Sequence, residues 1–186
     1  MKRTLIAICM TAAAVFGQTP APGTAQVRYG DQQQRIAQGA GSGQLTARET
    51  GNLERKESAI RQEVRTDRAL NNGRLTAGER GQVNNQQNRL SNQIYADKHN
   101  AAPQHYGNNQ VDSRRYNQQQ RIANGIASGR MNAAEASRVE HKEAAINHEV
   151  HNERAANGGH LTGGERAQVN NQQNQVSRQI YRTKHN

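Results

Sequence analysis

Residues 68–95 read RALNNGRLTAGERGQVNNQQNRLSNQIY, and residues 154–181 read RAANGGHLTGGERAQVNNQQNQVSRQIY. The correspondence continues on both sides without a gap. Residues 32–100 and 118–186 are identical at 41 of 69 positions when the sequence is shifted by 86. Self-similarity at a fixed spacing indicates one structural unit used twice. We therefore expect two homologous units.

A helix-start signal occurs twice in each unit. GQLTARE at 43–49 is followed by GRLTAGE at 73–79, and the second unit has GRMNAAE at 129–135 and GHLTGGE at 159–165. Each string places Thr or Asn three residues before Glu. This is the spacing of a capping box, in which each side chain satisfies a free backbone N–H of the first helical turn. The expected capping pairs are Thr46 with Glu49, Thr76 with Glu79, Asn132 with Glu135, and Thr162 with Glu165.

Apolar residues follow each start at intervals of seven and then four, which places them on one face of an α-helix. The seams are Leu53, Ile60 and Val64; Val83, Leu90 and Ile94; Val139, Ile146 and Val150; and Val169, Val176 and Ile180. On the other side of the first seam, Glu57 and Arg61 have the spacing of a favourable surface pair. No segment alternates with period two, so the sequence predicts an all-α fold.

Each unit should contain a short helix followed by a long antiparallel helical hairpin, because the loops within the hairpins are short. The long helices are expected at 46–70, 76–97, 132–156 and 162–183, and the short ones around 32–37 and 118–123. The polar runs NNQQN at 84–88 and 170–174 are interpreted as solvated faces. A unit this small buries little apolar surface. The two hairpins are therefore expected to share one core or to pair across a homodimer.

The N-terminus has the features of a secretory signal peptide. Lys2 and Arg3 precede an apolar run at 5–16, which is too short to span a membrane. Cleavage is expected after Gly17 or Ala25, and the mature chain would then have no membrane span. The expected layout is signal peptide and leader at 1–25, helical unit 1 at 26–100, linker at 101–116 and helical unit 2 at 117–186. These features predict a periplasmic or secreted protein.

Composition restricts the functions that the mature chain can have. Cys9 is the only cysteine and lies in the signal segment, so thiol catalysis and disulfides are excluded from the mature protein. No catalytic motif is present, and we expect neither an enzyme nor a cofactor. Without Lys2 and Arg3 the chain has 23 basic and 15 acidic residues, and it contains 22 Gln and 20 Asn. This charge favours weak, salt-sensitive binding to envelope polyanions or, non-specifically, to nucleic acid, although it is also compatible with a role in solubility alone.

Two features of the sequence have the residue types or spacing of a metal site. His148 and His151 share one helical face and could bind Zn²⁺ or Cu²⁺, but surface histidines are the simpler interpretation. The loops at 68–79 and 154–165 have the outline of EF-hands, with Gly and Glu at the required positions. Arg68 and Arg154 occupy the first ligand position, where an anion is needed, so capping is preferred to calcium binding.

The strings LTARE, LTAGE and LTGGE resemble the LTXXQ motif of Spy/CpxP-type periplasmic proteins, an all-helical family of stress chaperones and regulators. Glu replaces the final Gln of that motif at Glu49, Glu79 and Glu165, and Met131 begins a more divergent copy. The mature chain as a whole is similar to small secreted bacterial proteins of unknown function that carry a duplicated Gln/Asn-rich helical unit.

The sequence thus predicts an exported, non-enzymatic helical-repeat protein with a binding or structural role in the bacterial envelope or outside the cell. One alternative is a Spy/CpxP-like periplasmic chaperone or stress protein. The other is a divalent-metal-binding protein that uses degenerate EF-hand-like loops or the histidines of unit 2. The binding partner is either a protein or an envelope polyanion.

Overall fold

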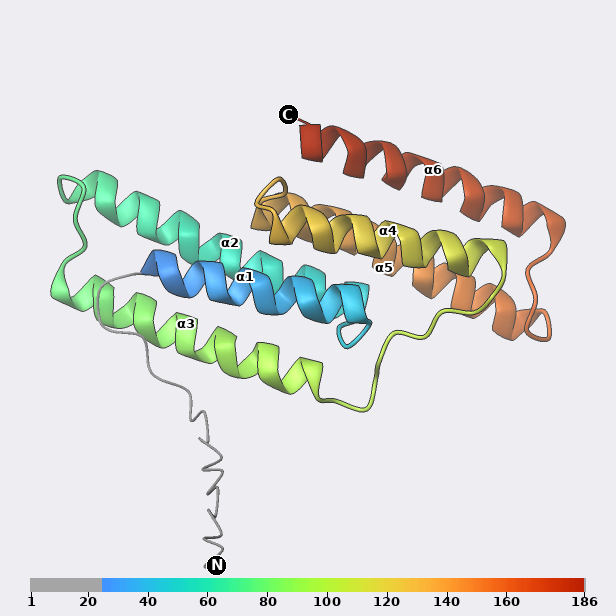
Figure 1. Cartoon of the computed structure of the whole chain (residues 1–186), viewed down its shortest axis with the longest axis horizontal. Coiled ribbons are helices and arrows are strands. Elements are labelled where there is room, and N and C mark those ends of the chain that lie inside the picture. Colours follow the sequence, from blue (N-terminus) through green and yellow to red (C-terminus); the bar gives the residue numbers. More distant parts are fainter. Residues whose placement is uncertain (1–24, 186) are drawn as a thin grey trace, which may run out of the picture.

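The computed structural model describes residues 25–185, and these form six α-helices and no strand (Figure 1). The helices are α1 (Ala25–Ser42), α2 (Ala47–Leu70), α3 (Ala77–Lys98), α4 (Gln110–Ala127), α5 (Ala133–Ala156) and α6 (Gly163–His185). The predicted all-α class is confirmed. The predicted signal peptide and leader at 1–25, with Cys9, lies outside the described residues except for Ala25, the first residue of α1. None of the six helices combines the length and the apolar character needed to span a membrane.

Helices α1 and α4 are longer than the sequence indicated. Both α1 and α4 have 18 residues, and α4 begins at Gln110, inside the segment expected to be a linker. The prolines and glycines around these segments favoured loops. Burial of Val111 and Asp112 explains the extension at α4, because the first turn packs onto the neighbouring helices.

Capping boxes begin the long helices at the expected positions. The side chains of Thr46, Thr76 and Asn132 each accept a hydrogen bond from the backbone N–H of the Glu three residues later, and that Glu accepts from the N-cap N–H. At α6, the Thr162 N–H donates to Glu165 at 2.7 Å, and the Glu165 N–H donates to Thr162 Oγ1 at 3.3 Å. Each cap therefore removes two unpaired donors from a helix start.

The loop between α2 and α3 contains a glycine in the left-handed conformation. Gly73 has φ 83°, and its N–H donates to the Arg68 carbonyl oxygen at 2.7 Å. Gly159, with φ 94°, makes the same bond to Arg154 in the loop before α6. Glycine adopts this conformation at little cost, so both loops turn the chain back within a few residues. Asn71 adds a side-chain bond to Glu79, which links the end of α2 to the cap of α3.

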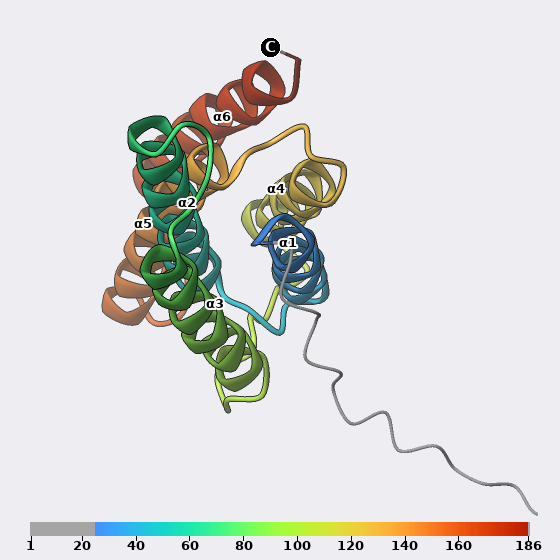
Figure 2. The same cartoon turned by 90° about the vertical axis from the view of Figure 1, so that its left-hand side faces the viewer.

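The long helices form antiparallel hairpins, α2 with α3 and α5 with α6. Glu63 on α2 accepts hydrogen bonds from Gln82 and Gln86 on α3, and Glu149 on α5 accepts from Gln168 and Gln172 on α6. The two hairpins meet where α2 packs along α5, while α1 and α4 pack against each other on one side of that pair (Figures 1 and 2). α3 and α6 lie at opposite margins of the molecule (Figure 2).

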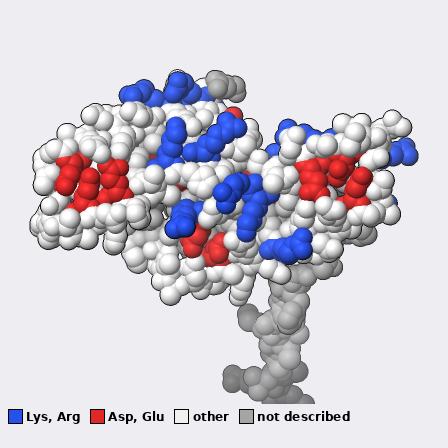
Figure 3. Space-filling view, turned by 180° about the vertical axis from the view of Figure 1, so that it is seen from behind, with Lys and Arg blue, Asp and Glu red and all other residues white. Residues whose placement is uncertain are grey.

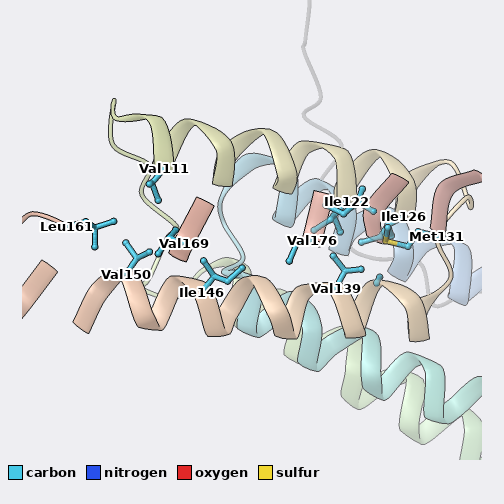
Figure 4. Packing of buried hydrophobic residues seen from close by; sticks show 13 residues of the cluster. Val111, Ile122, Ile126, Met131, Val139, Ile146, Val150, Leu161, Val169 and Val176 are labelled. Carbon is cyan, nitrogen blue, oxygen red and sulfur yellow. The ribbon is translucent and has the colours of Figure 1, made fainter. Parts of the chain in front are cut away.

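The apolar seams form two core clusters, which confirms the helical spacing. One contains Ile36, Leu45, Leu53, Ile60, Val83, Leu90 and Ile94. The other, shown in Figure 4, lies mainly among α4, α5 and α6 and contains Ala37, Val111, Ile122, Ile126, Met131, Ala136, Val139, Ile146, Val150, Leu161, Val169, Val176 and Ile180. Burial of these aliphatic groups is the main favourable contribution to folding.

Two glutamines of the polar runs are buried, so the interpretation of these runs as solvated faces is wrong at those positions. Gln87 is 2% exposed and Gln173 is fully buried. Their backbone carbonyl oxygens accept hydrogen bonds from the side-chain amides of Gln32 on α1 and Gln118 on α4, at 2.8 and 2.7 Å. A buried hydrogen bond from a side-chain amide thus holds α1 to α3 and α4 to α6.

Candidate functional site

Four glutamate side chains are buried where α2 packs against α5. Glu54, Glu57 and Glu140 are 0% exposed, and Glu143 is 2% exposed. Gln33 on α1 donates to Glu54 at 2.9 Å, and Gln119 on α4 donates to Glu140 at 2.5 Å. At least one carboxyl oxygen of each glutamate has no hydrogen-bond partner. We call these four residues the buried glutamate layer.

Burial changes the ionisation of this layer. It raises the pKa of Glu54 to about 8 and the pKa values of Glu57 and Glu143 to about 7, because a carboxylate loses hydration there. It also raises the pKa of Glu140 well above the usual value, and the nearby carboxyl groups of Glu143 and Glu54 add to this effect. The layer therefore favours neutral carboxylic acids inside the protein.

One guanidinium group acts on each half of the layer. The two groups come from helices that are not equivalent in the chain, α2 and α4. Arg61 on α2 acts electrostatically on Glu57 and lies 4.1 Å from the centre of the Tyr29 ring. Arg115 on α4 acts on Glu143 and donates through Nε to Asn147 at 2.5 Å. Both cations oppose the effect of burial and limit the rise in pKa.

Asp112 at the start of α4 holds two arginines. Its carboxylate contacts Arg115 at 2.8 Å and Arg154 at 3.1 Å. Although burial acts to raise it, hydrogen bonds from Arg154, Arg115 and Asn109 hold the pKa of Asp112 below its usual range. Arg154, which occupies the first position of an EF-hand-like loop, therefore serves as an ion-pair partner in a short network between α4 and α5.

The structure gives little support to the metal candidates. His148 and His151 are exposed on α5 and line a recess that also contains Arg115 and Arg154, whose charges disfavour a cation. His148 Nδ1 lies 3.3 Å from the side-chain amide of Asn152. Among residues 25–185, no group of three or more His, Cys, Asp or Glu side chains is arranged to hold a metal ion.

Basic side chains on the surface have few acidic partners. Within the described part of the chain, the only ion pairs are the two made by Asp112. Many arginines bond instead to neutral groups: Arg28 to Asn88, Arg35 to the Ser91 carbonyl oxygen, and Arg121 to the Ser177 carbonyl oxygen. These three guanidinium groups form no ion pair.

The face opposite α1 and α4 has an uneven charge distribution. Lys and Arg gather in its middle, with a few acidic side chains among them, and further clusters of Asp and Glu lie toward both ends (Figure 3). Arg61, Arg65 and Arg138 line a recess of about 300 Å³ between α2 and the start of α5. Near the α2–α3 loop, Glu63 and Glu79 act on Asp67, whose pKa is raised first by partial desolvation and then by these charges. The surface thus offers concentrated positive charge at its centre.

Sequence reasoning identified the caps but missed the buried glutamate layer. Glu57 was expected in a surface pair with Arg61, whereas the structure buries it. The layer could have been recognised from a second row of residues on α2, separate from the apolar seam. Small residues in this row permit close approach of another helix. The row consists of Ala47, Thr50, Gly51, Glu54 and Glu57.

The fold and these sites define an all-helical protein with a buried acidic layer and a basic surface. Comparison with protein-family models, curated proteins and solved structures found no match to this chain.

Proposed function

We propose that this chain is an exported, non-enzymatic helical-repeat protein that binds polyanions through its basic surface, in the bacterial envelope or outside the cell. The observation that carries the proposal is that most acidic groups are buried or are engaged in contacts within the protein. Of the 15 Asp and Glu residues, four are buried between α2 and α5, four occupy helix caps, and Asp112 pairs with two arginines. The basic residues are left largely without acidic partners and can attract polyanions.

We further propose that the six helices are two homologous units packed about an approximate two-fold axis, each unit consisting of a first helix and a hairpin. Reciprocal contacts support this arrangement. Gln34 donates to the Ala127 carbonyl oxygen at 3.2 Å, and Gln120, 86 positions after Gln34, donates to the carbonyl oxygen of Gly41 at 2.5 Å. Such pairs are expected when the same surface patch is used by both partners.

A chaperone role receives less support, because the exposed large apolar side chains are few. Within the described residues they are Leu70, Tyr95, Tyr116 and Tyr181. A client-binding surface requires a larger continuous apolar area. The Spy/CpxP-like function is therefore the second candidate. It is tested by measuring whether the protein suppresses the aggregation of an unfolded client.

Polyanion binding is tested by titrating the purified protein with fluorescent heparin over a series of salt concentrations, with neutral dextran as the control polymer. The affinity for heparin should fall steeply as salt rises, because binding releases counterions. Dextran should not bind. Absence of heparin binding at low salt, or binding that salt does not change, would reject the proposal.

Export is tested separately in the native host. Mass spectrometry of cell fractions should find the protein outside the cytoplasm, with its N-terminus at Gln18 or Gln26. An intact Met1 in the cytoplasmic fraction would reject export without affecting the binding proposal.

A further inference from the structure

One exposed face of α6 combines arginines with an aromatic ring. Arg178, Tyr181, Arg182 and His185 follow the helical spacing of three and four residues, and all four side chains are exposed. With Arg121 and Ser177, three of them line a recess of about 480 Å³ between α4 and α6.

The tyrosine ring is held in place and remains available. Tyr181 is 59% exposed, and its ring stacks on His185 with the centroids 4.2 Å apart. The His185 ring nitrogen Nδ1 lies 2.7 Å from the Tyr181 carbonyl oxygen, which ties the second ring to the helix end. Within residues 25–185, the tyrosine rings that have a guanidinium group over their face are Tyr29 and Tyr106. The Tyr181 ring has arginines beside it, but no guanidinium group of this part of the chain covers its face.

Positive charge around the ring is not neutralised. Arg121 donates to the Ser177 carbonyl oxygen at 3.2 Å, and Lys184 donates to the Arg121 carbonyl oxygen at 3.4 Å. The pKa of Lys184 is lowered by burial and then by the charges of Arg121 and Arg130. Neither ion pair within residues 25–185 involves any of these groups.

The corresponding face of α3 keeps the aromatic pair and carries fewer cations. Tyr95 stacks on His99 at 4.1 Å and is 62% exposed. Asn92 and Ala96 stand at the positions of Arg178 and Arg182, and Asp97 at the position of Thr183. The chain therefore contains a natural control, with the same ring geometry and fewer cations.

We propose that the face formed by Arg121, Arg178, Tyr181 and Arg182 binds single-stranded nucleic acid. The arginines contact backbone phosphates, for which the planar guanidinium group is suited. A base stacks on the open face of Tyr181, as bases do on aromatic side chains in single-strand binding proteins. A sulfated polysaccharide or an anionic lipid would use the arginines without needing the ring. This inference rests on the proposed polyanion binding and names its site and partner.

The test measures fluorescence anisotropy of a labelled 15-nucleotide oligo-dT and of labelled heparin with the purified protein and its variants. Tyr181→Ala should weaken oligo-dT binding by at least about 5-fold, the lower end for loss of one base stack, and leave heparin binding unchanged. Tyr95→Ala is the matched control and should change neither. Circular dichroism establishes that the variants keep their helical content.

The arginines are tested with Arg178→Asn/Arg182→Ala, which installs the residues present on α3. This variant should weaken both ligands and reduce the slope of log affinity against log salt for oligo-dT by about 0.7 for each lost phosphate contact. Vesicles of anionic phosphatidylglycerol are titrated separately, to test a lipid surface as the alternative partner.

The outcomes separate this inference from the proposed function. Binding of heparin or vesicles without oligo-dT, or equal effects of Tyr181→Ala and Tyr95→Ala on oligo-dT, would overturn the nucleic-acid site and leave polyanion binding intact. Failure to bind any of these ligands would overturn both.

Discussion

The hydroxyl group of Ser137 donates a hydrogen bond to the carbonyl oxygen of Gly51 at 2.8 Å, and the two residues lie 86 positions apart in the repeat. Contact between equivalent positions is what a two-fold axis passing between α2 and α5 would produce. A Cβ atom on Gly51 would lie 3.1 Å from Cβ of Glu140, so the helices approach closely here. The same approach removes the glutamate layer from water.

Gly51→Ala should fail to stabilise the protein, although alanine is normally favoured over glycine inside a helix by about 0.5–1 kcal/mol. The added methyl group would require Glu140 on the facing helix to move slightly away. Gly81→Ala is the control, because nothing lies within 4 Å of its Cβ position and alanine already stands at 167. Urea unfolding followed by circular dichroism should show a gain for Gly81→Ala only. An equal gain for Gly51→Ala would contradict the close contact.

The free energy of unfolding should decrease as pH rises from about 5 to about 8. Glu54, Glu57, Glu140 and Glu143 have folded-state pKa values above the ordinary value of 4.5. In this window the folded protein holds more protons than the unfolded chain, so raising pH favours unfolding. The contribution of these glutamates to stability is fully present below their pKa in the unfolded chain. It is lost as pH rises through their pKa values in the folded protein, which are near 7 for Glu57 and Glu143 and near 8 for Glu54.

The groups that face the layer determine the size of this effect. They are Gln33, Tyr29 and Arg61 near Glu54 and Glu57, and Gln119, Tyr106 and Arg115 near Glu140 and Glu143. Each unit of pKa increase corresponds to about 1.4 kcal/mol. Glu54→Gln/Glu140→Gln should flatten the pH profile and raise stability at pH 8 relative to the unmodified protein. A profile unchanged by this double substitution would exclude the layer as its cause.

Thr76→Ala and Thr162→Ala should each lower the free energy of unfolding by about 0.5–2 kcal/mol. Each change removes the oxygen that accepts from the N–H of Glu79 or Glu165 at 3.3 Å. Serine at either position keeps this acceptor and serves as the control. If the alanine variants unfold at the same urea concentration as the serine variants, the caps do not contribute as described.

A fragment of residues 26–101 should be dimeric or largely unfolded at micromolar concentration. As a monomer it would expose Gly51, Glu54 and Glu57, which are buried in the full chain. A second copy can cover them, because the proposed two-fold arrangement makes this surface complementary to itself. Analytical ultracentrifugation combined with circular dichroism distinguishes the states. A folded monomer with a sharp thermal transition would show that one unit is stable alone.

Much of the local structure could be predicted from sequence. The pattern of Thr or Asn with Glu three residues later located the starts of α2, α3, α5 and α6, because a capping box involves only neighbours in the chain. The apolar seams indicated which helix faces are buried. The start of α4 could not be obtained in this way, because its first turn is buried against other helices through Val111 and Asp112.

The sequence by itself determined the helices, the hairpin loops and the uneven charge, since these follow from neighbouring residues and composition. Only the tertiary structure decided that Glu54 and Glu140 are buried and that Arg178 and Arg182 flank an open ring beside Arg121 of α4. A glutamate on a helix is ordinarily assigned to the surface, because its charge is costly to bury. Here α2 and α5 each bury a second face, and that face exists only after the two hairpins have come together.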